Sequence, residues 1–231
     1  MYLYAALCEH CGSVKRAGSA GPDFYIDTKE RRIWIEAIAP TPGHGPDAVI
    51  PFPSGTREAR RVPEDQILLR FTAAMREKAN QFNRALLANR VQSTDAYVVA
   101  INSRDIDPYY GGEPPYYLKA FLPIGHHAVA IDPRTGEIVD QMITYRNQLK
   151  KANEAPVPTD TFLSGAYPLV SAVLHSRVDC TNLPSRLGGD FQMLHNPSAV
   201  SIPDDLFAFI KQFRVTKDND SFSLRELESK K

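Results

Sequence analysis

The chain has 231 residues, enough for one packed domain, and its 43% hydrophobic and 23% charged residues are typical of a globular protein. Its 27 basic and 27 acidic residues cancel, which excludes an overall field that would draw the whole chain to nucleic acid or to a membrane. No apolar run approaches the roughly 18 residues of a membrane span, so we expect no membrane partner. Three cysteines, an odd count, favour a reducing, cytoplasmic setting over a disulfide framework.

The first forty residues predict a short helix followed by two strands. The helix covers Leu3–Cys11, and Gly12 is a natural residue for its end. Phe24–Asp27 and Ile33–Ala39 are typical of strands, and the polar Thr28–Arg31 segment between them is typical of a turn.

The strongest helical signal lies in residues 64–91, after a loop over 40–63 that is rich in proline and glycine. At about 100° per residue its apolar side chains fall on one arc, with Arg76 on the opposite side. The arc consists of Ile67, Phe71, Ala74, Met75, Phe82, Ala85 and Leu86. The next segment, AYVVAI over 96–101, is a continuous apolar run, as expected of a central strand that is covered on both faces.

The rest of the chain predicts mostly strands. Residues 107–123 are rich in tyrosine and proline and are typical of an irregular insertion, and the turn DPRTG joins 128–131 to 137–139 in a hairpin. Further along we expect a short helix over 141–152, a strand or helix over 169–174, a last strand over 191–194, and a charged tail from Lys217 that forms a surface helix or is disordered.

This order of elements predicts an α/β fold with a mixed central sheet, helices flanking the sheet, and added strands toward the C-terminus. We expect a single domain over residues 1–215 and a charged tail over 216–231.

Two acids lie in the predicted hairpin near the N-terminus. If Thr28–Arg31 is a four-residue loop, Asp27 pairs with Arg32, and four steps back the pairing puts Asp23 opposite Glu36. Opposed side chains lie about 5 Å apart, where two carboxylates repel unless a shared proton, a basic group or a cation intervenes. A shorter turn would shift this pairing.

A simpler interpretation is that Asp23 begins a strand at the surface and Glu36 points to solvent. Strand alternation argues against it, because Glu36 shares a face with Trp34 and Ile38 and that face is not polar. Mg²⁺ is a cation that proteins often hold with one or two carboxylates.

A lysine lies within the apolar arc of the predicted long helix. Lys78 follows Ala74 by four residues and Met75 by three, and Gln81 is one turn further on. The lysine either extends along the helix to reach solvent or directs its ammonium at acids beneath the helix. With the two opposed acids it would form a site in which carboxylates hold a metal ion and the ammonium offsets developing negative charge.

These residues resemble the PD-(D/E)XK nuclease superfamily, over roughly residues 1–102. In that superfamily an acid, often after proline, lies on one strand, and a second acid and a lysine follow on the next strand with one residue between them. Pro22-Asp23 matches the first element and Glu36 the second, whereas Ile38 occupies the lysine position. In some members the lysine has moved to the following helix, and Lys78 resembles that arrangement.

The resemblance implies a restriction-endonuclease-like core and a Mg²⁺- or Mn²⁺-dependent phosphodiester hydrolase acting on DNA. It implies metal ligation by Asp23, Glu36 and the carbonyl group of Ala37, with Lys78 and Gln81 completing the catalytic residues. The resemblance is also compatible with a homodimer.

Three arginines in the loop before the long helix are candidates for nucleic-acid binding. Arg57, Arg60 and Arg61 would contact phosphate groups beside the acids. The alternative is that they form a solvated loop.

Two other interpretations remain at this point. Ile38 in the lysine position also fits a catalytically degenerate member that serves as a binding or assembly module. An unrelated α/β fold is the third interpretation, and it predicts that Asp23 and Glu36 lie more than about 8 Å apart, beyond side-chain reach across a strand pair.

Overall fold

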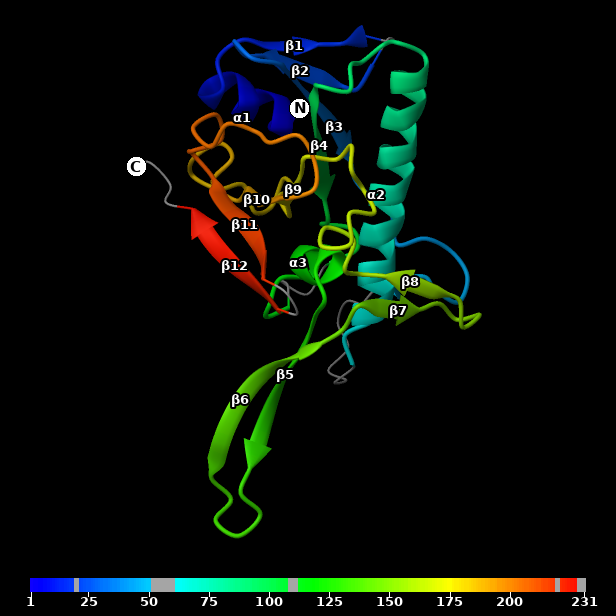
Figure 1. Cartoon of the computed structure of the whole chain (residues 1–231), viewed down its shortest axis with the longest axis vertical. Helices are drawn as coiled ribbons and strands as arrows, with labels where there is room; N and C mark the ends of the chain where they lie inside the picture. Colours follow the sequence, from blue (N-terminus) through cyan, green and yellow to red (C-terminus); the bar gives the residue numbers. More distant parts are fainter. Residues whose placement is uncertain (19–20, 51–60, 108–111, 219–220, 228–231) are drawn as a thin grey trace.

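The computed structural model describes residues 1–18, 21–50, 61–107, 112–218 and 221–227 of the chain. Their centre is an eight-stranded mixed sheet with helices packed against both faces (Figure 1), which confirms the predicted α/β class. In chain order the strands of this sheet are β1 (Val14–Arg16), β2 (Phe24–Asp27), β3 (Arg32–Ile38), β4 (Ala96–Asn102), β9 (Ala172–Ser176), β10 (Gln192–His195), β11 (Lys211–Asp218) and β12 (Ser221–Leu227).

The order of strands across the sheet is β1-β2-β3-β4-β9-β10-β11-β12. β3, β4 and β9 run parallel to one another at the centre. The pairs β1–β2, β2–β3, β9–β10 and β11–β12 are antiparallel, whereas β10–β11 is parallel. The sheet is therefore mixed, and the strands added after residue 169 complete one side of it.

The apolar run of β4 divides between two cores, because successive side chains of a strand point to opposite faces. Tyr97, Val99 and Ile101 pack with helices α2 (Glu64–Leu87) and α3 (Tyr116–Phe121). Val98 and its neighbours on the other face pack with helix α1 (Tyr2–His10). Among the described residues, no helix combines the length and the apolar character that crossing a membrane requires.

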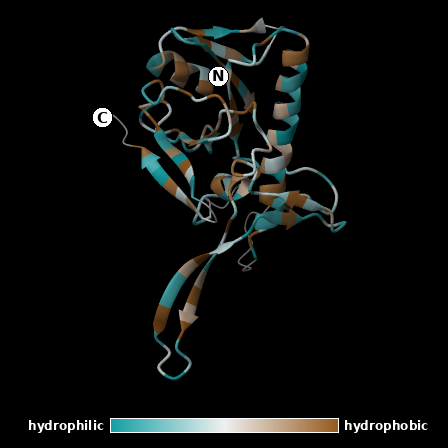
Figure 2. Cartoon of the chain, viewed as in Figure 1, coloured by the Kyte–Doolittle hydropathy of each residue, from teal (hydrophilic) through white to brown (hydrophobic). Residues whose placement is uncertain are grey.

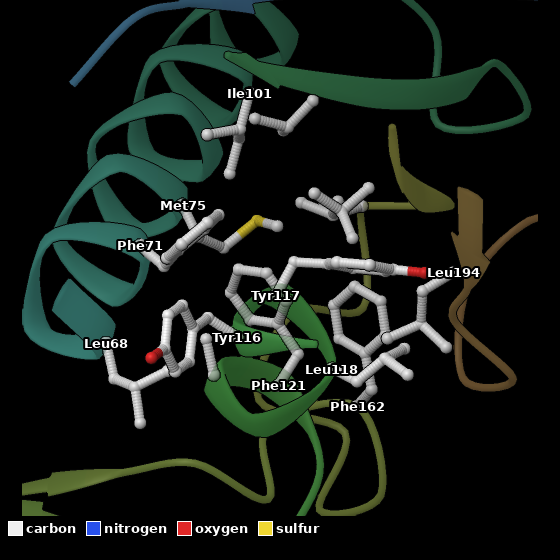
Figure 3. Close-up of a cluster of buried hydrophobic side chains, with 14 of the residues drawn as sticks. Leu68, Phe71, Met75, Ile101, Tyr116, Tyr117, Leu118, Phe121, Phe162 and Leu194 are labelled. Carbon is white, nitrogen blue, oxygen red and sulfur yellow. The ribbon is translucent and has the colours of Figure 1, made fainter. Parts of the chain in front are cut away.

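Helix α2 follows the sequence prediction closely. The predicted apolar arc points into the core, where Phe71 and Met75 are fully buried (Figure 3), as is Ile67. The helix ends at Leu87 rather than Val91, since Asn89 adopts a positive φ of 54° that a right-handed helix cannot continue through. The described residues of the preceding loop, 40–50 and 61–63, contain no helix or strand, as predicted.

The irregular insertion predicted over 107–123 is wrong in part, because it contains helix α3. Every residue of α3 is buried, and Tyr117 and Phe121 fill the space between α2 and the sheet (Figure 3). Tyrosine-rich segments between prolines are typical of loops, but here burial of the rings outweighs local propensity. The helix begins directly after Pro115, so the proline limits its start and does not interrupt it.

The short helix predicted over 141–152 is also wrong. Residues there form the second half of strand β6 (Ile138–Tyr145) and then β7 (Gln148–Lys150), which pairs with β8 (Pro156–Pro158). Strand β6 pairs with β5 (Ile124–Ile131), so the predicted hairpin exists and is longer than expected. The β-branched Ile143 and Thr144 favour the extended backbone.

The tail predicted from Lys217 as a surface helix or disordered segment is wrong over 217–218 and 221–227. Lys217 lies in β11, and Phe222 and Leu224 of β12 alternate with polar residues and pack against the core. The sheet therefore extends beyond the predicted domain end at residue 215. The sequence prediction also missed β1, a strand of three residues that pairs with β2.

The β5–β6 hairpin projects away from the sheet (Figure 1). Hydrophobic residues occur along both of its strands (Figure 2), and Val129, Ile131, Ile138 and Ile143 are about half exposed. At its base Arg146 forms an ion pair with Glu64 of α2, with 3.1 Å between Nη2 and Oε1. Most of the hairpin therefore contributes nothing to the two cores.

Shortening this hairpin is expected to leave the fold almost unchanged. Joining Ala128 directly to its partner Met142 through Asn-Gly removes exposed residues that contact mainly each other. The free energy of unfolding, measured in urea through the fluorescence of Trp34, is expected to fall by less than about 1 kcal/mol. A larger loss would mean that the hairpin packs against the rest of the molecule in solution.

Candidate active site

The predicted register of the β2–β3 hairpin is confirmed. Asp27 pairs with Arg32 and Phe24 with Ile35, so one further step places Asp23 opposite Glu36. The backbone N–H of Asp23 donates to Glu36 Oε2 over 3.2 Å. The two residues are therefore within side-chain reach, and the separation of more than about 8 Å expected for an unrelated fold is not found.

The turn that sets this register is held by a threonine. Thr28 Oγ1 donates to the carbonyl group of Arg31 over 2.7 Å and accepts the N–H of Arg31 over 3.1 Å. Hydrogen bonds of this kind mimic backbone turn bonds and are a local property of the sequence. At the same end of the hairpin Asp27 accepts from Arg32 and Lys15, and these two bonds, the first above all, lower the pKa of its carboxyl group.

Asp23 lies directly before β2, and its side chain is held by β3. One oxygen, Oδ2, accepts the backbone N–H of Ala37 over 2.9 Å. The side chain is exposed, and no described residue donates a hydrogen bond to Oδ1. One carboxylate oxygen is thus fixed in position, and the other keeps its lone pairs available for a ligand.

Lys78 of α2 points at Glu36 and not along the helix to solvent. Its Nζ lies 2.9 Å from Glu36 Oε1 and 3.2 Å from Gln81 Oε1. The two charged side chains are only 13% and 6% exposed. An ammonium has three N–H donors, so one remains after these two bonds.

Tyr97 supports the lysine from beneath, and the sequence prediction did not identify this residue. Its hydroxyl donates to the backbone carbonyl of Lys78 over 3.2 Å, and its ring stacks on Phe82 with 4.1 Å between centroids. Burial raises the pKa of Tyr97, and the charges of Glu36 and Asp23 raise it further. The hydroxyl therefore stays protonated and positions α2. The sequence signal for this role was the hydroxyl group of Tyr97 within the otherwise apolar run AYVVAI.

Ile38 lies where the family pattern has a lysine. The residue is half-buried and packs against the core between the sheet and α2. It lies two residues after Glu36 on the same face, so its side chain closes the space beside the acids with apolar surface. The only ammonium bonded to Glu36 among the described residues comes from Lys78.

The carboxylate oxygens of Asp23 and Glu36 fit a Mg²⁺ ion whose remaining ligands come from water and a substrate. Magnesium is commonly bound by one or two carboxylates, with water and phosphate oxygens completing its coordination. Asp23 has a free oxygen, and each oxygen of Glu36 accepts one hydrogen bond and keeps a second lone pair. Within the described ranges no group of three or more His, Cys, Asp and Glu side chains could hold a metal. Ligation by the carbonyl group of Ala37 stays a prediction.

The predicted arginine contacts are not placed beside the acids by the described residues. Arg57 and Arg60 lie outside the described ranges, and Arg61 is exposed before the first turn of α2. Glu64, at the start of α2, precedes Lys78 by 14 residues, which is about 21 Å along a helix. Phosphate binding by these arginines beside the acids stays a prediction.

Comparison of the chain with protein-family models, with curated proteins and with solved structures found no match. The class of protein is defined by the fold and the site alone: an α/β chain that brings two opposed carboxylates and a helix-borne lysine together beside its central sheet.

Proposed function

We propose that this chain is a Mg²⁺-dependent phosphodiester hydrolase acting on DNA, a divergent member of the PD-(D/E)XK nuclease superfamily. The observation that carries the proposal is the contact of Lys78 Nζ with Glu36 Oε1 at 2.9 Å while Asp23 N contacts Glu36 Oε2 at 3.2 Å. Residues from the segment directly before β2, from β3 and from α2 meet at one point, in the combination that phosphoryl-transfer chemistry uses.

Each residue has a role that follows from its contacts. Asp23 and Glu36 would hold the ion, which when bound polarises a phosphate oxygen and makes water a stronger nucleophile. The remaining N–H of Lys78 would bind a phosphate oxygen and offset its growing negative charge. The bond from Lys78 to Gln81 Oε1 leaves the amide N–H groups of Gln81 to orient water or phosphate.

The test is cleavage of a labelled DNA duplex and of its single strands with Mg²⁺ or Mn²⁺. Asp23→Asn is expected to lower the rate at least 100-fold, on the order of 3 kcal/mol of transition-state stabilisation. Asp27→Asn is the matched control, because Asp27 lies at the other end of β2 and contacts Arg32 and Lys15 instead. Equal rates for the parent and for Asp23→Asn would contradict the proposal.

A second candidate function is a catalytically degenerate nuclease fold that serves as a binding or assembly module. The packing of Ile38 against the core favours it, since the strand position of the family's lysine is apolar. Calorimetric titration with Mn²⁺ separates the two functions. Saturable binding that disappears in Asp23→Asn/Glu36→Gln supports the hydrolase, whereas absence of both binding and cleavage in the parent supports the module.

The proposal places the protein in the cytoplasm. All three cysteines are free, and Cys8 and Cys180 are exposed. Exposed free thiols are usual where the surroundings keep them reduced.

A further inference from the structure

A cavity of about 430 Å³ opens directly beside the two acids, between the segment before β2 and the C-terminal half of α2. Pro22, Gln81, Arg84, Ala88, Arg90 and Tyr97 are among the residues that line it. Cavities of roughly 300 to 1,000 Å³ are typical of small-molecule sites, so this one has room for one unit of an extended ligand.

The cavity adjoins the acid site, because three of its lining residues neighbour or contact residues of that site. Pro22 directly precedes Asp23. Gln81 accepts the bond from Lys78, and Tyr97 donates to the carbonyl group of Lys78. A ligand in the cavity would therefore meet Gln81, which bonds Lys78, and Lys78 in turn bonds Glu36.

Two arginines give the cavity its charge. Arg84 and Arg90 are exposed, and neither forms an ion pair with any described residue. In contrast, Arg32 and Arg146 of the same chain bond carboxylates at 2.7 Å and 3.1 Å. The guanidinium groups of Arg84 and Arg90, which no described carboxylate neutralises through an ion pair, thus lie next to the place where a phosphodiester would bind.

We propose that this arginine cavity, formed by Arg84 and Arg90, binds the phosphate of a nucleotide that adjoins the cleaved one in a nucleic-acid strand. The planar guanidinium group matches phosphate oxygens with two parallel hydrogen bonds. The proposal rests on the proposed function, because it takes the acids to hold the neighbouring phosphodiester. It assigns the strand a course along α2 from Lys78 past Gln81 to Arg84.

Arg84 also lies in the last turn of α2, where a positive side chain interacts favourably with the helix dipole. That structural role predicts a loss of stability on substitution but no change in how binding depends on salt. The urea midpoint of each variant, followed through Trp34, therefore accompanies the binding measurement.

The experiment measures binding of a fluorescein-labelled single-stranded DNA of about 20 nucleotides, in EDTA, by fluorescence anisotropy over a range of salt concentrations. The plot of log binding constant against log salt has a slope of about −0.7 per phosphate contact for single strands. Arg84→Ala/Arg90→Ala is expected to make the slope shallower by about 1.4. Arg134→Ala, an exposed arginine at the tip of the β5–β6 hairpin, is the matched control and is expected to keep the parent slope.

The outcomes separate this proposal from the proposed function. A shallower slope in the double variant alone supports the arginine cavity, whether or not the parent cleaves DNA. Equal slopes in the parent and both variants, or no binding by the parent, overturn it. Metal-dependent cleavage together with equal slopes supports the hydrolase function and contradicts phosphate binding in the arginine cavity. DNA binding whose salt dependence requires Arg84 and Arg90, without cleavage, supports phosphate binding in the arginine cavity. The function would then be that of the binding module.

Discussion

Replacement of Lys78 with methionine is expected to lower the free energy of unfolding by about 3 kcal/mol or more. The substitution keeps most of the side-chain volume but removes the ammonium from Glu36, whose side chain is 6% exposed. The carboxylate would keep one hydrogen bond, from the backbone N–H of Asp23. A buried charge without its partner is costly because water cannot replace the lost interaction.

A double variant separates the charge from the packing. Glu36→Gln in the Lys78→Met background removes the unpaired charge, so it is expected to restore more than half of the lost stability. Lys15→Met is the matched control, since Lys15 pairs with Asp27 over 3.0 Å and both side chains are well exposed. Exposed pairs contribute at most about 1 kcal/mol.

Trp34, the single tryptophan of the chain, reports the result because it is 4% exposed and lies on β3 two residues before Glu36. The free energy of unfolding is obtained from its fluorescence in urea. If Lys78→Met costs no more than Lys15→Met, then Glu36 does not depend on the lysine for its burial.

Local chemistry explains why much of the candidate site could be predicted. The register of β2 and β3 follows from a four-residue turn whose hydrogen bonds all involve Thr28 and its near neighbours. The inward direction of Lys78 follows from its place among Ile67, Phe71 and Met75 at helical spacing. Both signals are contained in short segments and need no knowledge of the rest of the fold.

The residues that sequence reasoning missed depend on contacts far apart in the chain. Tyr97 supports Lys78 from a strand that is 19 residues further on. Arg84 and Arg90 line one cavity because the end of α2 and the segment before β2 lie side by side in the fold. The tyrosine within AYVVAI is a local signal, but it does not show which residue the hydroxyl contacts, and the cavity leaves no local pattern.

The errors in the fold have a similar cause. Helix α3 exists because Tyr117 and Phe121 are buried against α2 and the sheet, which residues 107–123 alone do not indicate. Strand β12 carries Arg225 and Glu226 but pairs along its length with β11. Tertiary pairing decided the structure of both segments against their composition.

Acid is expected to destabilise the fold through His175 of β9. Its side chain is buried, contacts Ser103 Oγ through Nε2 at 2.8 Å, and stacks on Tyr117 with 4.7 Å between ring centroids. Burial, and to a smaller extent the positive charge of the nearby Arg177, lower the pKa of His175 to about 3. The unfolded chain would bind the same proton near pH 6.5.

Between these two values the unfolded state binds a proton that the folded state does not, so stability falls as the pH falls. The stability that the neutral His175 side chain contributes is fully present above about pH 6.5. As the pH falls toward 3, this stability is lost at about 1.4 kcal/mol per pH unit. Burial also lowers the pKa of His195, which acts in the same direction. From about pH 6.5 to 4.5, His175 alone is expected to remove about 2 kcal/mol.

Urea unfolding of the parent and of His175→Gln at several pH values tests this effect. Glutamine keeps a hydrogen-bonding group for Ser103 but does not titrate, so the variant is expected to lose less stability than the parent on acidification, whatever its stability at neutral pH. His127→Gln, at an exposed position on the β5–β6 hairpin, is expected to follow the parent. Equal losses in the parent and in His175→Gln would mean that the buried imidazole gains its proton without unfolding.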